Sequence, residues 1–207
     1  MERNEATLTM KRVLVFATNN AHKLQEVQQL VGEKVTLKSL NDIGFDEEIP
    51  ETGTTFEENS LQKCVCIYNR FNMDCFADDS GLEVEALNNE PGVYSAHYSG
   101  SRDDRKNLEL VLKKLAGTIN RKARFRAVIS LIIDGKVRVF EGVVNGIIRD
   151  KVSGAAGFGY DPIFQPEGYD ITFAEMNLEE KNKISHRGRA MTKLVEYLNS
   201  ASAQNRV

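Results

Sequence analysis

The chain has 207 residues, of which 28% are charged, with 30 Asp and Glu against 27 Lys and Arg. A chain of this length buries roughly 70% of the surface that its unfolded form exposes, so disulfides and structural metals are not needed for folding. The formal charge of −3 argues against broad binding of nucleic acid through the phosphate backbone. Any affinity for anions must therefore be local.

Residues 1–10 include Glu2, Arg3 and Glu5 and contain no apolar run, so they predict a tail rather than a signal peptide or a membrane span. A single domain is expected over residues 11–200. The longest apolar stretch elsewhere, Ala127–Ile133, is too short to cross a bilayer and has the length of a buried strand. These features predict a soluble, cytoplasmic protein.

Strand and helix patterns alternate along the first part of the chain. The expected elements are a strand at Arg12–Thr18, a helix at Ala21–Val31, a strand at Val35–Leu40, a helix with an apolar stripe of Leu61, Cys64, Val65, Tyr68 and Phe71, short strands at Cys75–Ala77 and Leu82–Ala86, and a helix at Arg102–Ala116. Two overlapping capping boxes, Thr54 with Glu57 and Thr55 with Glu58, mark the start of the second helix.

The second half of the chain contains a hairpin signal, since Asp134-Gly135 separates two apolar runs, Arg124–Ile133 and Lys136–Ile148. Asn177–Asn199 is expected to be helical with a break near Ser185. Parallel strand–helix units joined to an antiparallel hairpin predict an α/β fold with a mixed central sheet and flanking helices. The hairpin and the last helices are expected to form a second lobe.

A polar junction between the first strand and the first helix is the first candidate site. Backbone N–H groups at a helix N-terminus favour anions, and Asn tolerates the left-handed conformation that brings a chain close to a phosphate. Lys23 in the first helical turn opposes the helix dipole, so it requires an anionic partner nearby. The junction matches neither the GxxxxGK[ST] phosphate loop nor the GxGxxG fingerprint. The alternative is an Asn-capped helix with an exposed lysine.

Acidic residues form the second candidate site. Asp78 and Asp79 directly follow a short apolar strand, which places a carboxylate at a strand end, where α/β sheets tend to hold ligands. Glu51 lies in the connection before the second helix. Magnesium takes oxygen ligands and keeps several waters, so one or two carboxylates plus substrate phosphates suffice. The alternative for residues 78–81 is an ordinary turn between two strands.

Glu58 shares the apolar stripe of the second helix by periodicity, and an inward carboxylate would need a partner. It is also the last member of a capping box, in which its side chain bonds back to the helix start. Both interpretations stay open from the sequence.

Two further stretches carry ligand-binding side chains. Glycines in residues 154–161 allow close backbone approach to a ligand, and Phe158 and Tyr160 offer flat faces on which a purine could stack. Lys181 and Arg187 lie near the helix start expected at Ser185, where cations are disfavoured unless they face an anion or an electronegative edge. A flexible loop and a surface helix are the alternatives.

Taken in order, the motifs FATNNAHKLQEV, ETGTTFEENSLQK, ADDSGLEVEAL, PGVYSAHYSG, GFGYDPIF and EEKNKISHRGRA resemble those of the inosine triphosphate pyrophosphatase family over residues 12–198. The resemblance implies hydrolysis of ITP, dITP and XTP to the nucleoside monophosphate and diphosphate, in a nucleotide cleft between two lobes. It also implies a Mg²⁺ cofactor and a homodimer. Family members often have Gly where this chain has Asn19, and because Asn is the least costly replacement for Gly at positive φ, we expect the turn to survive.

The resemblance also assigns roles to individual residues. Asp79 would be the general base for the attacking water, and Glu51 and Asp79 would bind the magnesium ion. The implied substrate-binding residues are Thr18, Asn19, Asn20, Ala21, His22, Lys23, Ser80, Phe158, Gly159, Tyr160, Asp161, Lys181, His186 and Arg187. Donors such as Lys181 or Arg187 would favour a 6-keto purine over the 6-amino group of adenine.

Two other function classes remain open from the sequence. A pyrophosphatase of related fold that acts on pyrimidine or modified nucleotides would share the phosphate-binding residues and differ in the base pocket. A nucleotide-binding protein without catalysis would keep Lys23 and the base loop but would not need Asp79.

Overall fold

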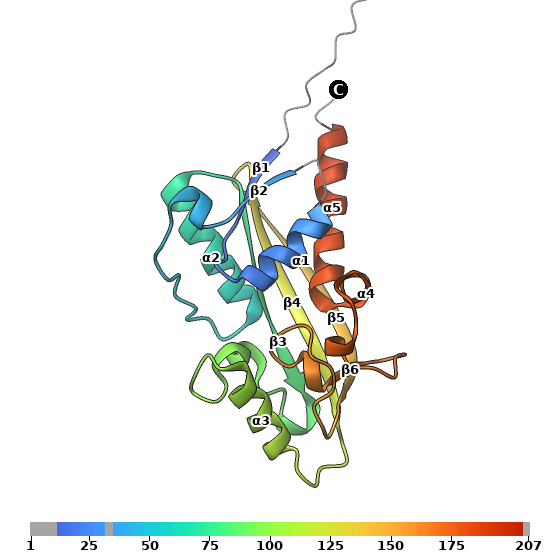
Figure 1. The fold of residues 1–207 in the computed structure, drawn as a ribbon. Coiled ribbons are helices and arrows are strands. Elements are labelled where there is room, and N and C mark those ends of the chain that lie inside the picture. The colour runs from blue at the N-terminus through green and yellow to red at the C-terminus, as the bar shows by residue number, and fades with distance from the viewer. Residues whose placement is uncertain (1–11, 32–34, 205–207) are drawn as a thin grey trace, which may run out of the picture.

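Six strands form one mixed sheet in the computed structural model, which describes residues 12–31 and 35–204 (Figure 1). The sheet order is β2-β1-β3-β4-β5-β6, with β1 parallel to β2 and β3 and the remaining neighbours antiparallel. The strands are β1 (Arg12–Phe16), β2 (Val35–Lys38), β3 (Cys75–Val84), β4 (Lys122–Ile133), β5 (Lys136–Ile148) and β6 (Phe164–Pro166). The expected tail at 1–10 and residue 11 of the expected domain lie outside the described residues.

Helices cover both faces of the sheet (Figure 1). They are α1 (Ala21–Val31), α2 (Phe56–Phe71), α3 (Asp104–Lys114), α4 (Leu178–Ile184) and α5 (His186–Gln204). Side chains alternate along β1, so that Leu14 and Phe16 pack with α1 and α5 while Val15 and Ala17 pack on the face covered by α2. Among the described residues, no helix is long and apolar enough to cross a membrane.

A second lobe lies at the far end of the long strands. Its core joins Leu82 and Val84 of β3 to Phe125 of β4, to the inner face of α3 and to Phe164 and Phe173. The expectation that the hairpin and the last helices form this lobe is wrong, because α5 packs against β4, β5 and α1 in the first lobe. The hairpin strands are long enough to run through both lobes (Figure 1).

Strand β3 is continuous, which corrects the expected pair of short strands separated by a turn. Residues 78–81 are paired in register with β4, for example Asp79 with Val128. On its other side, β3 pairs with β1 only at Cys75 and Phe76, because β1 ends at Phe16. Over residues 78–81, β3 therefore has β4 on one side and the cleft between the lobes on the other, whereas farther along the same edge Glu83 forms a bridge with Pro91.

Local sequence signals locate the turn and the helix starts. The β4–β5 turn has positive φ at Asp134 and Gly135, as the Asp-Gly pair predicts. Thr55 caps α2 and forms a capping box with Glu58, which is exposed. The inward orientation of Glu58 is therefore excluded and the capping interpretation is confirmed. Ser185 separates α4 from α5, and its hydroxyl accepts a hydrogen bond from the Gly188 N–H.

Candidate functional site

A cavity of about 560 Å³ lies between the lobes, beside the unpaired edge of β3. Of the residues predicted to act, those that line it are Thr18, Asn19, Asn20, Lys23, Glu51, Asp79, Ser80, Phe158, Gly159, Tyr160, Asp161, Lys181, His186 and Arg187. Ala21 and His22 do not line the cavity. The His22 ring instead stacks on Phe158, with 5.2 Å between the ring centroids.

The junction after β1 is held by its own side chains. The Asn20 carboxamide oxygen accepts hydrogen bonds from the N–H groups of His22 and Lys23, so Asn20 caps α1. These two N–H groups are therefore already used within the helix start. Asn19 is exposed and has no positive φ, unlike the described residues Asn72, Asn88, Asn89 and Asp134. The turn forms here without a left-handed residue at position 19.

Asp78 and its two cations form a buried network on one face of β3. Lys23 Nζ donates to Asp78 Oδ1 at 2.9 Å, and Arg187 Nε donates to Asp78 Oδ2 at 3.1 Å. Arg187 also donates to the Ser80 hydroxyl at 3.0 Å. Burial alone would raise the pKa of Asp78, but attraction by Lys23 and Arg187 dominates and holds it well below its usual value. The anionic partner that Lys23 requires is therefore Asp78.

Asp79 points to the opposite face of β3, toward α2. Its carboxylate accepts hydrogen bonds from the Asn59 amide at 3.0 Å and from the Ser80 N–H at 2.9 Å, and it lies 4.0 Å from Lys63 Nζ. Burial raises the pKa of Asp79 above its ordinary value, with Lys63 and Lys23 acting in the opposite direction. Asp79 is thus a buried, hydrogen-bonded carboxylate at the cavity wall.

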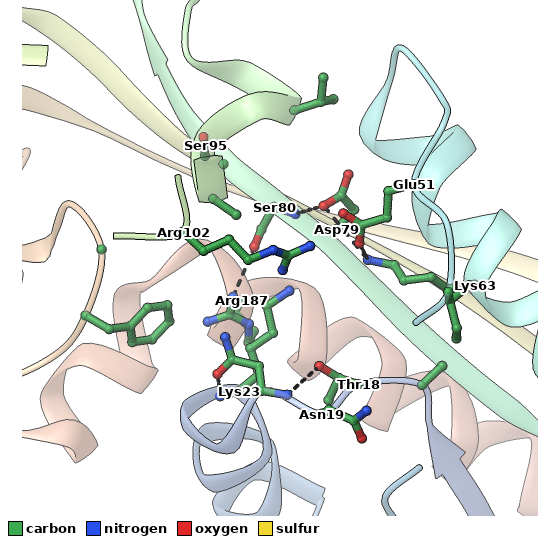
Figure 2. Close-up of a pocket in the computed structure, with 18 of the residues that line it drawn as sticks. Thr18, Asn19, Lys23, Glu51, Lys63, Asp79, Ser80, Ser95, Arg102 and Arg187 are labelled. Carbon is green, nitrogen blue, oxygen red and sulfur yellow. Dashed lines mark hydrogen bonds and ion pairs between the residues drawn. The ribbon is translucent and has the colours of Figure 1, made fainter. Parts of the chain in front are cut away.

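Lys63 lies between the two carboxylates predicted to bind metal. Its ammonium group donates to Glu51 Oε1, and Figure 2 shows it directed toward both Asp79 and Glu51. Burial would raise the pKa of Glu51, but the neighbouring Lys63 outweighs it and lowers that pKa. Burial also disfavours the charged form of Lys63, yet attraction by Asp79 and Glu51 dominates and raises its pKa.

The base-binding candidates lie at the other end of the cavity. The Phe158 ring has Lys181 Nζ at 4.8 Å and the Arg187 guanidinium at 5.7 Å from its centroid. Asp161 holds this arrangement by accepting hydrogen bonds from the Phe158 N–H and from Lys181 Nζ. Tyr160 is buried, with its hydroxyl donating to the Ser95 carbonyl, and burial raises its pKa. Phe158 is therefore the half-buried aromatic face at this end.

His186 is buried and not on the surface as a lone histidine would suggest. Its ring stacks on Phe125 with 4.7 Å between centroids, and its Nδ1 atom has no hydrogen-bond partner among the described residues. Burial, reinforced by the charges of Arg187 and Lys181, lowers the pKa of His186 well below its usual value. The imidazole is therefore neutral near pH 7.

Lys63 was missed because the predicted apolar stripe of α2 is displaced around the helix. The buried face carries Phe56, Asn59, Ser60, Lys63, Cys64 and Ile67, whereas Val65 is 40% exposed. Three polar residues share the helical period of Phe56, Cys64 and Ile67, and this signal could have identified them as inward-facing. They are tolerated there because α2 meets the polar part of β3.

Arg102 was also missed, and it reaches the cavity from the second lobe (Figure 2). It pairs at 2.8 Å with Glu48, which lies in the acidic connection of the first lobe. Both side chains are largely exposed, so the pair contributes little to stability. No sequence pattern marked Arg102, because the contact joins two loops that lie far apart along the chain.

Together, the fold and the site define an α/β protein with a mixed sheet and a charged cavity between two lobes. The chain belongs to the Ham1 family, whose family model matches residues 14–197.

Individual relatives support this assignment. The chain is 49% identical to a dITP/XTP pyrophosphatase of Flavobacterium psychrophilum, over 89% of this chain and 97% of that protein. It is 48% identical to a dITP/XTP pyrophosphatase of Flavobacterium johnsoniae, with the same coverage of both chains. The solved structure of the Staphylococcus aureus Ham1 protein superposes with a TM-score of 0.85 at 40% identity, covering 92% of this chain and all of that one. The family resemblance and the two-lobed mixed-sheet fold expected from the motifs are confirmed.

Proposed function

We propose that the protein hydrolyses non-canonical purine nucleoside triphosphates, namely ITP, dITP and XTP, to the nucleoside monophosphate and diphosphate. Relatives with 48–49% identity over almost their full length bear the name dITP/XTP pyrophosphatase. One observation carries the proposal. One end of a single cavity holds lysines and two carboxylates, of which Asp79 is buried and Glu51 is not, and the other end holds an aromatic ring with cationic donors. A triphosphate and a purine base require these two environments.

The phosphate end has cations from separate elements. Lys23 of α1 and Lys63 of α2 line the cavity together with Thr18, Asn19 and Asn20. Positive charges that are fixed before the substrate arrives stabilise the charge that develops on the phosphates without reorganisation. Ala21 and His22 support this end indirectly, as the first turn of α1 and through the stacking of His22 on Phe158.

The residues present fit a Mg²⁺ ion. Glu51 and Asp79 both line the cavity, and Lys63 lies between them, paired with Glu51 and 4.0 Å from Asp79 Oδ1. Two carboxylates with substrate phosphates make the oxygen ligand set that magnesium takes. The bound ion would neutralise phosphate charge during the reaction.

Asp79 has the burial and orientation of a general base. In the proposed step, Asp79 removes a proton from a water molecule, and the water oxygen forms a bond to phosphorus as the α–β anhydride bond breaks. The electrons of that bond leave with the departing phosphate oxygen. The buried environment, which raises the pKa of Asp79, improves its ability to accept this proton.

Base selection is assigned to the opposite end. Phe158 and the Gly159–Asp161 segment would enclose the purine, with Lys181, His186 and Arg187 beside it and Ser80 in between. A 6-keto oxygen can accept a hydrogen bond from Lys181 or Arg187, whereas a 6-amino group would place a donor against these donors. The neutral His186 lines the same region, and its Nδ1 atom is buried and has no hydrogen-bond partner among the described residues. ATP would therefore be a poor substrate.

Several broader proposals follow from the family. We propose that residues 11–200 act as one domain, that the protein is a cytoplasmic homodimer, and that its partner is the nucleotide substrate rather than nucleic acid or a membrane. The net charge of −3 supports the last point, because it disfavours binding to polyanions.

The test is diphosphate release from ITP, XTP, dITP, GTP, ATP, dTTP and UTP under identical conditions. The proposal predicts that kcat/KM for ITP, dITP and XTP exceeds that for ATP. A discrimination of roughly 10²-fold or more is expected where a buried site would place a donor of the base against a donor of the protein. Rapid hydrolysis of dTTP or UTP together with no hydrolysis of ITP would contradict the proposal and indicate a pyrimidine-directed enzyme. Binding of these nucleotides without turnover would indicate a nucleotide-binding protein without catalysis.

A further inference from the structure

Asn59 contacts two parts of the site at once although it does not line the cavity. Its side chain is buried, and its amide nitrogen donates to Asp79 Oδ2 at 3.0 Å. Its carboxamide oxygen accepts a hydrogen bond from the Gly53 N–H at 2.8 Å. Gly53 lies two residues after Glu51, so one side chain connects the carboxylate on β3 to the segment that carries the second carboxylate.

Only one orientation of the Asn59 amide satisfies both contacts. The Gly53 N–H is a donor and must face the amide oxygen, while the Asp79 carboxylate is an acceptor and must face the amide nitrogen. Gly53 also approaches closely, because a Cβ atom there would lie 2.7 Å from the Asn59 oxygen. The pairing is therefore specific to Asn at 59 and favours Gly at 53.

Two donors on different oxygens define the rotation of the Asp79 carboxylate. The Asn59 amide donates a hydrogen bond to Oδ2, and the Ser80 N–H donates one to Oδ1 at 2.9 Å. Oδ1 is also the oxygen that lies 4.0 Å from Lys63 Nζ. Each carboxylate oxygen accepts about two hydrogen bonds. Oδ1 can therefore accept one more hydrogen bond, while the Asn59 amide is bonded to Oδ2.

We infer that Asn59 is a positioning residue for the reaction, which fixes the Asp79 carboxylate toward the cavity and ties it to the segment of Glu51. This inference rests on the proposed function and extends it to a residue outside the cavity wall. Because Asn59 acts through Asp79, its loss lowers turnover while substrate binding, which depends on other side chains, is retained.

The variant Asn59→Asp separates the two contacts. The aspartate keeps an oxygen for the Gly53 N–H and has the same size, but it places a second acceptor against Asp79 in place of the donor. Diphosphate release from ITP is expected to show a kcat about 10- to 100-fold below that of the wild type, the range typical of residues that orient a reactive ligand. KM and the Kd of an ITP analogue with a methylene group between the α- and β-phosphates should stay within about threefold. Asn59→Ala, which removes both contacts, provides a second variant with the same expected split.

Ser60→Ala is the matched control, because Ser60 is the next residue of α2 and is equally buried. Its hydroxyl bonds to the Ser130 hydroxyl at 2.8 Å and not to the site. The control should lose a buried hydrogen bond and keep its kcat. Three results overturn the inference: a kcat within about twofold of the wild type in both Asn59 variants, an equal loss in Ser60→Ala, or a parallel loss of analogue binding. A wild-type protein that releases no diphosphate from ITP refutes the proposed function itself.

Discussion

Asp78 and Arg187 form a buried ion pair across 109 positions of sequence, with Nε and Oδ2 separated by 3.1 Å. The other oxygen of the carboxylate holds Lys23. Arg187 lies at the proposed base end of the cavity and Lys23 at the proposed phosphate end. Asp78 therefore links side chains of both ends. Asp78 itself does not line the cavity, and its role is to hold cations in place.

The variant Asp78→Asn tests this role. Removing the charge leaves Arg187 buried without its anion, and breaking one partner of a buried ion pair costs about 3–5 kcal/mol. We expect the free energy of unfolding, measured by urea denaturation, to fall by about 3 kcal/mol. Asp150→Asn is the control, since Asp150 is exposed and its pairing with Arg121 is a surface contact. Equal stability of the two variants would contradict the role of Asp78.

The variant Asp79→Asn removes the proposed general base and one proposed metal ligand while keeping the shape of the side chain. Turnover of ITP should fall at least about 10²- to 10⁴-fold, the usual contribution of a general base. Partial binding of the methylene analogue should survive, because Lys23 and the base end remain. Turnover is measured by diphosphate release at fixed times, and binding of the analogue by calorimetric titration. Turnover at the wild-type rate in this variant would refute the assigned role.

Removal of magnesium should abolish activity. Lys63 pairs with Glu51 and lies near Asp79, and a single lysine does not supply the charge needed beside two carboxylates and a triphosphate. Excess chelator is expected to stop diphosphate release, and added Mg²⁺ to restore it. A thermal melt in chelator serves as the control and should be unchanged, because folding does not need the ion. Activity that persists in chelator would disprove the metal requirement.

His186 predicts a pH dependence of stability. Because burial lowers the pKa of His186 in the folded state, protonation favours the unfolded chain. Its contribution to stability is fully present above the unfolded pKa of about 6.5 and is lost as the pH falls below that value. The free energy of unfolding should decrease by up to about 1.4 kcal/mol per pH unit from this group. The His186→Gln variant should show a flatter decrease in the free energy of unfolding between about pH 6.5 and pH 5. The control variant His97→Gln, at an exposed position, should show the same decrease as the wild type. Identical profiles for wild type and His186→Gln would exclude the effect.

Local chemistry made part of the fold predictable. The Asp134-Gly135 pair requires two positive φ angles and so defines the hairpin, and Thr55 and Ser185 mark helix starts through their hydroxyls. Each of these signals acts between neighbouring residues. The expected strand and helix order of the first half follows from the same kind of local pattern.

Contacts between distant segments were not predictable in this way. Residues 78–81 suit a turn by composition, and only the pairing with β4 makes them a strand. Lys63 and Asn59 face inward because β3 presents carboxylate chemistry to α2, which no property of α2 alone reveals. The pairing of Lys23 with Asp78 likewise depends on β1 ending early enough to leave the edge of β3 open.

The extended backbone of β3 separates the two neighbouring aspartates. Successive side chains of a strand point to opposite faces, so Asp78 meets Lys23 and Arg187 while Asp79 meets Asn59 and Lys63. Shifting β3 against β4 by a single residue would turn each aspartate to the opposite face. Depending on the direction of the shift, either Asp79 would move to the position between Lys23 and Arg187, or Asp78 would move to the position beside Asn59 and Lys63. Insertions or deletions within β3 should therefore inactivate the protein even when the twelve-residue partner strand still pairs with it.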